Sequence, residues 1–194
     1  KYSTFGICLL SMKKVVLLGG GNVAYHLAKQ LMNSRKYQLI QLYNRSPLSS
    51  HFQEIITEKT THLEALLPAD IYILSVKDEA IAALCEQLPF EGQLVVHTSG
   101  SVPMEALSPR QRRGVFYPLQ SFSKAQVVDF AKVPFCLETE EATDYALLED
   151  LAKEFSPKSY AIDSLQRQYL HVAAVFLNNF TNHLWYLSEQ LCTH

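Results

Sequence analysis

Three consecutive glycines at residues 19–21 follow the apolar run VVLL and precede NVAYHLAKQL, which has helical spacing. Gly19, Gly21 and Ala24 fit the pattern G-x-G-x-x-[G/A]. In this pattern the first glycine makes a tight turn, the second admits a pyrophosphate, and the third position packs a helix against a strand. Backbone amides at the start of the helix then bind the phosphates. We therefore predict a dinucleotide-binding turn; the alternative is a tight turn that binds nothing.

The residues after the second expected strand indicate which dinucleotide would bind. An NAD site has Asp or Glu there for the ribose hydroxyls, whereas this chain has Asn44, Arg45 and Ser46. No carboxylate is present to repel a 2′-phosphate, and the Arg45 guanidinium and the Ser46 hydroxyl are suitable donors for one. The pattern favours NADP over NAD. In the alternative, Arg45 is an ordinary solvated arginine.

Another expected strand ends in the segment LSVKDEAI. Ligands of open parallel sheets bind beyond the carboxyl ends of the strands, which is where Ser75 and Val76 stand. We interpret Asp78 as the N-cap of the following helix, a role compatible with lining a cofactor.

The segments VVHTSGS and VFYPLQSF also follow or end expected strands. Ser99 and Gly100 are small enough to let a flat nicotinamide ring approach the backbone. We interpret His97 as a buried neutral histidine. Tyr117 and the polar residues after it form either a pocket wall or an edge strand that ends at a proline.

The hydropathy pattern alternates between strands and helices, which predicts a doubly wound, mostly parallel Rossmann-type α/β sheet. Expected strands lie at 14–19, 38–44, 59–62, 70–76, 92–100, 114–119, 133–138 and 158–163. Expected helices lie at 22–34, 48–56, 78–88 and 140–155. We divide the chain into an N-terminal extension (1–12), a dinucleotide-binding domain (13–163) and the start of an all-α domain (164–194).

The stretch from about Asp163 onward has no Gly or Pro for 28 residues and reads as one long helix, apolar on most of its circumference. Such a helix needs partners to cover it. We therefore expect a fragment of a longer protein, a homodimer formed through these C-terminal helices, or both.

Composition and charge argue against a nucleic-acid-binding, membrane-spanning or metal-binding protein. The 194 residues are 48% hydrophobic and carry a net charge of −2, which gives no basic field for nucleic acid. No apolar run approaches the roughly 20 residues of a membrane span. The four cysteines are widely spaced and form no CxxC pair, so we expect reduced thiols, no metal site and a cytoplasmic protein. We expect residues 1–12 to be either an extension without structural significance or a short extra strand.

Taken in order, the segments GGGNVA, NRS, SVKDEAI, HTSGS, YPLQSF and LHVAAVFLNNF resemble a family of NADP-dependent oxidoreductases. Its members join a Rossmann-like domain to a helical domain of unknown function that usually dimerises. They are distant relatives of pyrroline carboxylate reductase, ketopantoate reductase and the β-hydroxyacid dehydrogenases. The resemblance covers about residues 13–190. Two departures are Tyr117, where relatives tend to have His, and a helical domain shorter than theirs.

The resemblance also implies a set of cofactor-binding residues: Gly19, Gly21, Asn22, Val23, Asn44, Arg45, Ser46, Ser75, Val76 and Ser99.

The better-known reductases carry a lysine on the long helix, four residues before an asparagine. If Asn179 is that asparagine, the lysine position is Val175, and residues 159–194 contain no lysine. His171, Val175, Asn178 and Asn182 share one face by their spacing, which suggests a polar stripe facing the cofactor. His171 has a reference pKa suited to a general acid at neutral pH. The alternative is that these side chains satisfy buried polar groups.

Two functions remain open. The first is an oxidoreductase that transfers a hydride to or from a small carbonyl, imine or hydroxy-acid substrate, with His171 or Tyr117 replacing the lysine and Asn179 assisting. The second is a non-catalytic NADP(H)-binding or sensing module that regulates a partner. Fold alone cannot separate them, because the Rossmann fold hosts many roles.

Overall fold

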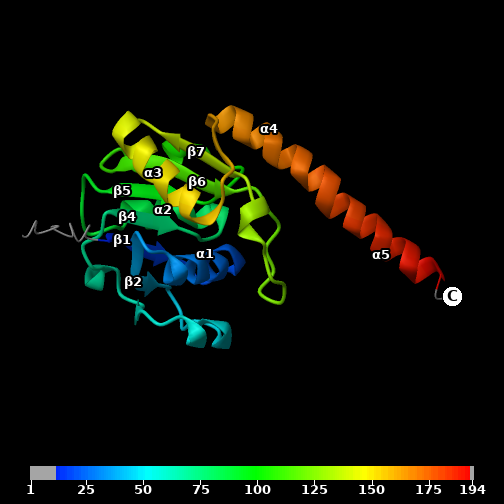
Figure 1. The fold of residues 1–194 in the computed structure, drawn as a ribbon, viewed down its shortest axis with the longest axis horizontal. Coiled ribbons are helices and arrows are strands. Elements are labelled where there is room, and N and C mark those ends of the chain that lie inside the picture. Colours follow the sequence, from blue (N-terminus) through cyan, green and yellow to red (C-terminus); the bar gives the residue numbers. More distant parts are fainter. Residues whose placement is uncertain (1–11, 193–194) are drawn as a thin grey trace, which may run out of the picture.

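The computed structural model describes residues 12–192 and consists of an eight-stranded sheet covered by helices, followed by a long C-terminal helix (Figure 1). The strand order is β3-β2-β1-β4-β5-β6-β7-β8. The strands are β1 (Lys13–Leu18), β2 (Tyr37–Tyr43), β3 (Glu58–Thr60), β4 (Ile71–Leu74), β5 (Leu94–His97), β6 (Arg112–Pro118), β7 (Phe135–Thr139) and β8 (Ser159–Ala161). This is the predicted Rossmann-type α/β fold, with the chain order reversing between β1 and β4.

The helices alternate with the strands as the hydropathy pattern predicts. The α-helices are α1 (Asn22–Asn33), α2 (Asp78–Glu86), α3 (Ala142–Phe155), α4 (Ser164–Val175) and α5 (Thr181–Cys192). Short 3-10 helices are η1 (Ser50–Glu54), η2 (Leu63–Ala65), η3 (Met104–Ala106) and η4 (Phe130–Lys132), and η5 (Phe176–Phe180) is a π-helical turn.

Apolar side chains on both faces of the sheet form the core. Val15 and Leu17 of β1 point to the face covered by α1 and α3, and Val16 and Leu18 point to the face covered by α2. All four are fully buried, as expected for a central parallel strand that is covered on both sides. The glycine turn is therefore attached to a fully buried strand at the centre of the sheet.

The structure departs from the sequence prediction in two elements. The segment 48–56, expected as an α-helix, is the 3-10 helix η1, which is five residues long. The segment 114–119 is not an edge strand, because β6 pairs with β5 on one side and with β7, antiparallel, on the other. The remaining strand pairs are parallel.

The structure also bears on the expectations for the N-terminal extension, the cysteines and membrane spans. The N-terminal extension and Cys8 lie outside the described residues, except for Met12. Cys85, Cys136 and Cys192 are free thiols. In the part of the chain that the structure describes, none of the helices has the length and apolarity of a membrane span.

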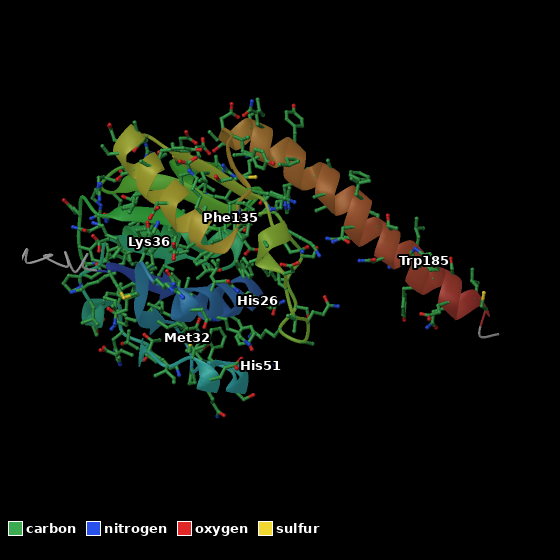
Figure 2. The ribbon with its side chains drawn as sticks, in the orientation of Figure 1. His26, Met32, Lys36, His51, Phe135 and Trp185 are labelled. Carbon is green, nitrogen blue, oxygen red and sulfur yellow. The ribbon has the colours of Figure 1, made fainter. Side chains whose placement is uncertain are left out.

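The predicted long helix is confirmed as a continuous run of 29 residues, α4–η5–α5, interrupted only by the π-helical turn. Figure 1 shows it leaving the sheet domain, and Figure 2 places Trp185 on its distal half, away from the sheet. Leu177, Leu184, Trp185 and Leu191 on this helix are all exposed. The homodimer expected from this apolar surface stays a prediction.

The first turn of the long helix is fixed by a buried ion pair. Asp163 forms a capping box with Gln166, which starts α4. One turn in, the fully buried guanidinium of Arg167 pairs with Glu138 of β7 at 2.5 Å and donates to the Val102 carbonyl at 2.6 Å. Ser164 donates its backbone N–H and its hydroxyl to the same Glu138 carboxylate. These contacts attach α4 to the antiparallel part of the sheet.

We expect Glu138→Ala to lower the free energy of unfolding by about 3 kcal/mol or more, because the Arg167 charge would stay buried without its partner. Urea unfolding followed by circular dichroism measures this. The matched control is Glu149→Ala, which removes a solvent-exposed pair with Lys153 and should cost less than about 0.5 kcal/mol. Equal losses in the two variants would contradict the role given to the buried pair.

Candidate functional site

A cavity of about 1080 Å³ lies at the carboxyl ends of the central strands, between the glycine turn, β6 and α4. It contains every predicted site residue except Gly19 and Asn179. The predicted residues that line it are Gly21, Asn22, Val23, Asn44, Arg45, Ser46, Ser75, Val76, Ser99, Tyr117 and His171. The topology explains this gathering, since strand ends of a parallel sheet meet at one edge.

The glycine turn has the geometry that the motif predicts. Gly19 lies behind the cavity at φ +134°, and a Cβ there would be 2.0 Å from the carbonyl oxygen of Ser75. A side chain at Gly21, by contrast, would meet nothing within 4 Å. Gly21 is the N-cap of α1, no side chain caps this helix, and its first turn holds no acidic residue. The first amides of α1 are thus available to an anion.

The residues after β2 form the second wall. The Asn44 side-chain amide donates to the Ser46 carbonyl at 2.7 Å, which shapes this turn. Arg45 is exposed and has no ion pair among residues 12–192. A smaller hollow of about 370 Å³ adjoins the cavity here and shares Asn44, Ser46 and Ser49 with it. An arginine without a carboxylate partner beside two hollows suits an anionic group of a ligand.

The ends of β4 and β5 form the floor. The Thr98 hydroxyl donates to the Ser75 hydroxyl at 3.2 Å, which joins the two strand ends. Asp78 is not the N-cap of α2; that position is Lys77, and Asp78 is the first helical residue. The Asp78 carboxylate instead accepts a hydrogen bond from the Ser101 hydroxyl. The expected capping role is therefore corrected to a link between the start of α2 and the loop after β5.

His97 is the buried neutral histidine that the sequence indicates. It is fully buried, and its Nδ1 accepts a hydrogen bond from the Ser99 backbone N–H at 3.2 Å. Burial, together with the nearby Arg167 charge, lowers the pKa of His97 from 6.5 to about 4. The ring hydrogen of the neutral form is then on Nε2, and His97 supports Ser99 from below the cavity.

Tyr117 and His171 form a pair at the opposite end of the cavity. The Tyr117 hydroxyl and His171 Nδ1 are 2.9 Å apart, and the two rings meet edge to face. Burial raises the pKa of Tyr117 to about 12, so the phenol stays protonated at neutral pH. Gly100 leaves room for them, because a Cβ there would lie 2.5 Å from His171 Nδ1 and 2.7 Å from Tyr117 Cζ. The arrangement can donate a proton to a ligand in the cavity.

The asparagines further along the helix divide into two groups. The Asn178 side-chain amide donates to the Ser121 hydroxyl at 2.7 Å, and Asn182 donates to Asn178. The stripe predicted from the spacing thus continues past His171 to face the β6–β7 connection. Asn179 is exposed and is not part of the cavity lining, and its assignment to catalysis stays a prediction.

Sequence reasoning missed two side chains at this site. Phe122 lines the cavity beside Gln120, one of the polar residues expected after Tyr117 as a pocket wall, and the Lys124 ammonium donates to the Gly20 carbonyl at 3.1 Å. Gln120, Phe122 and Lys124 come from residues 119–134 between β6 and β7, hereafter the β6–β7 connection. The signal available for Phe122 was its position within PLQSF. Nothing in the sequence indicates that Lys124 reaches the glycine turn, 104 residues away.

Comparison with known proteins gives two successive family matches. Residues 14–100 match the family described as NADP oxidoreductase coenzyme F420-dependent, and residues 133–194 match a domain of unknown function. Among curated proteins, none is significantly similar to the chain in sequence.

Solved structures resemble most of the chain. A Bacteroides fragilis protein assigned as an NADP oxidoreductase is 39% identical, with a TM-score of 0.84 over 94% of this chain and 73% of its own. A Thermotoga maritima protein is 22% identical, with a TM-score of 0.75 over 92% of this chain and 69% of its own. Pyrroline carboxylate reductase of Plasmodium falciparum, with NADP bound, is 14% identical, with a TM-score of 0.67 over 92% of this chain and 67% of its own. The last two are similar in fold.

The lowered pKa of His97 predicts a pH-dependent stability. Between 6.5 and about 4 the unfolded chain binds a proton that folded His97 does not, so the free energy of unfolding falls as the pH falls through this window. This histidine should account for about 2 kcal/mol lost between pH 7 and pH 5.

Urea unfolding at both pH values checks this, by comparing the wild type with His97→Asn. The stability difference between the two proteins should shrink by about 2 kcal/mol at pH 5. His183→Asn, on the exposed face of α5, is the control and should leave the pH dependence unchanged. An identical pH dependence in the wild type and His97→Asn would contradict the assignment.

Proposed function

The chain belongs to the family of the Bacteroides fragilis NADP oxidoreductase, and on that premise we propose that it transfers a hydride between NADP and a small carbonyl, imine or hydroxy-acid substrate. The observation that carries the proposal is the Tyr117–His171 pair, 2.9 Å apart, in the same cavity as the glycine turn and Arg45. A proton donor and a dinucleotide site in one cavity are the two parts that a reductase needs.

The residues present fit the NADP that the family uses. Amides at Gly21 and Asn22 would hold the pyrophosphate, because the first turn of α1 is uncapped and free of carboxylates. Arg45 and Ser46 would hold the 2′-phosphate, where an NAD site has an acidic residue. When bound, the cofactor supplies or accepts the hydride.

We assign the proton to the Tyr117–His171 pair. The Tyr117 hydroxyl and His171 Nδ1 share one hydrogen bond, so an imidazolium form of His171 would give Nδ1–H to the Tyr117 oxygen and keep Nε2–H for a substrate. A substrate oxygen or nitrogen would take the Nε2 proton as the neighbouring carbon receives the hydride, which leaves a neutral imidazole. Tyr117 also fixes the orientation of the imidazole, since its ring is buried in β6.

The alternative is a non-catalytic NADP(H)-binding module. It is favoured by the lack of any lysine in residues 159–194, where the better-known reductases carry one. The two proposals share the cofactor site and differ only in whether the Tyr117–His171 pair takes part in turnover.

The cofactor assignment is tested by titrating the chain with NADPH and NADH and following nicotinamide fluorescence. We expect NADPH to bind more tightly than NADH. Arg45→Glu should weaken NADPH binding by about tenfold or more and so abolish the preference, because it replaces the phosphate-binding charge with a repelling one. Arg35→Glu is the control, since Arg35 is exposed outside the cavity. A preference for NADPH that persists in Arg45→Glu would contradict the assignment of Arg45 to the 2′-phosphate.

The catalytic assignment is tested by screening carbonyl and imine substrates for NADPH oxidation. His171→Ala should lower kcat by about a hundredfold or more while NADPH binding changes by less than about threefold. Tyr117→Phe should also lower kcat, because it releases the imidazole. His183→Ala on the same helix is the control. Unchanged turnover in His171→Ala would remove the pair from the mechanism and leave the binding module.

A further inference from the structure

We propose that Lys124 is a second cationic residue for the 2′-phosphate of NADP, in addition to Arg45. The inference rests on the proposed function, because it names a further residue that determines cofactor specificity at the same site. It is carried by the position of Lys124 at the junction of the glycine turn and the segment that follows β2.

The β6–β7 connection brings Lys124 to this position by crossing over the start of α1. The Asn22 side-chain amide donates to the Phe122 carbonyl at 2.8 Å, and His26 Nε2 lies 2.9 Å from the Ser123 carbonyl. The rings of His26 and Phe122 also pack together. Two side chains of α1 thus hold the backbone immediately before Lys124, so the position of the lysine is defined by the fold.

The ammonium group contacts the glycine turn and the segment that follows β2. Lys124 Nζ donates to the Gly20 carbonyl at 3.1 Å and to the Ser49 hydroxyl at 3.2 Å, and it lies 5.1 Å from the centre of the Phe52 ring. Ser49 lies four residues after Arg45 on the segment where a 2′-phosphate is expected. Gly20 and Ser49 both line the large cavity.

This cation has no compensating charge. Lys124 is half-buried, and among residues 12–192 it makes no salt bridge; its hydrogen-bond acceptors are a neutral carbonyl and a neutral hydroxyl. By contrast, Lys132 on the same connection is exposed and paired with Asp129. A partly desolvated ammonium without a carboxylate favours the approach of an anion.

The pyrophosphate is a weaker candidate for that anion. It is already matched by the uncapped amides of α1, whereas two of the three Lys124 contacts lie on the segment 49–52 beyond β2. Lys124 and Arg45 would then both act on one phosphate, Arg45 as a planar fork and Lys124 as a point charge.

The test is a binding titration of the full chain with NADPH and with NADH, which needs no substrate or turnover. Lys124→Gln should weaken NADPH binding by about tenfold and leave NADH binding within about twofold, because only NADPH has the 2′-phosphate. Lys124→Arg should keep the preference for NADPH. Lys132→Gln is the matched control and should change neither affinity. Thermal unfolding of each variant verifies that it folds.

The outcomes separate this inference from the proposed function. If the wild type prefers NADPH and Lys124→Gln keeps that preference, or weakens both cofactors equally, Lys124 does not act on the 2′-phosphate. If the wild type shows no preference for NADPH, the proposed cofactor is wrong and the inference is overturned with it. A selective loss of NADPH affinity that Lys124→Arg rescues would support both.

Discussion

The buried ion pair between Arg167 and Glu138 decides where the long helix lies, and one wall of the candidate site depends on that placement. His171 follows Arg167 by four residues and therefore lies on the same face of α4, one turn further along. Because the Arg167 guanidinium is held against β7, the His171 imidazole lies in contact with Tyr117 of the neighbouring strand β6. Desolvation of two charges is costly, and the hydrogen bonds from Ser164 to Glu138 help to offset it. The contact that anchors the helix therefore also brings His171 to Tyr117.

The two ends of the cavity differ in charge, which gives it a direction. Arg45 lies at the end near β2, and Lys124 contacts Gly20 and Ser49 of the lining there; neither cation has an ion pair among the described residues. Tyr117, whose burial keeps it protonated, lies with His171 at the end near β6. A ligand with phosphates on one half and an uncharged reactive group on the other is matched by this asymmetry. The direction follows from the strand order, since β2 and β6 stand on opposite sides of the point where the order reverses.

How far the sequence predicts the site depends on how local each feature is. The glycine turn and Arg45 could be predicted because their roles follow from spacing within one strand–turn–helix unit. Tyr117 and His171 could each be singled out, yet not their contact, because 54 residues and an antiparallel strand separate them. Lys124 could not be found at all, since no local pattern shows that the β6–β7 connection crosses to α1.

The long helix shows how one residue of register changes an interpretation. Likeness to the better-known reductases points to Asn179 with Val175, one turn before it, in the place of the lysine. In the structure the neighbouring Asn178 bonds to Ser121 of the β6–β7 connection, and consecutive side chains of a helix point in different directions. Asn179 therefore points elsewhere and is exposed. On the face that does meet the cavity, the group able to donate a proton is His171, a turn nearer to the Arg167 anchor than position 175. The histidine proposed in place of the reductases' lysine takes its position from a contact with β6, so the chemistry proposed for this chain depends on the sheet as much as on the helix.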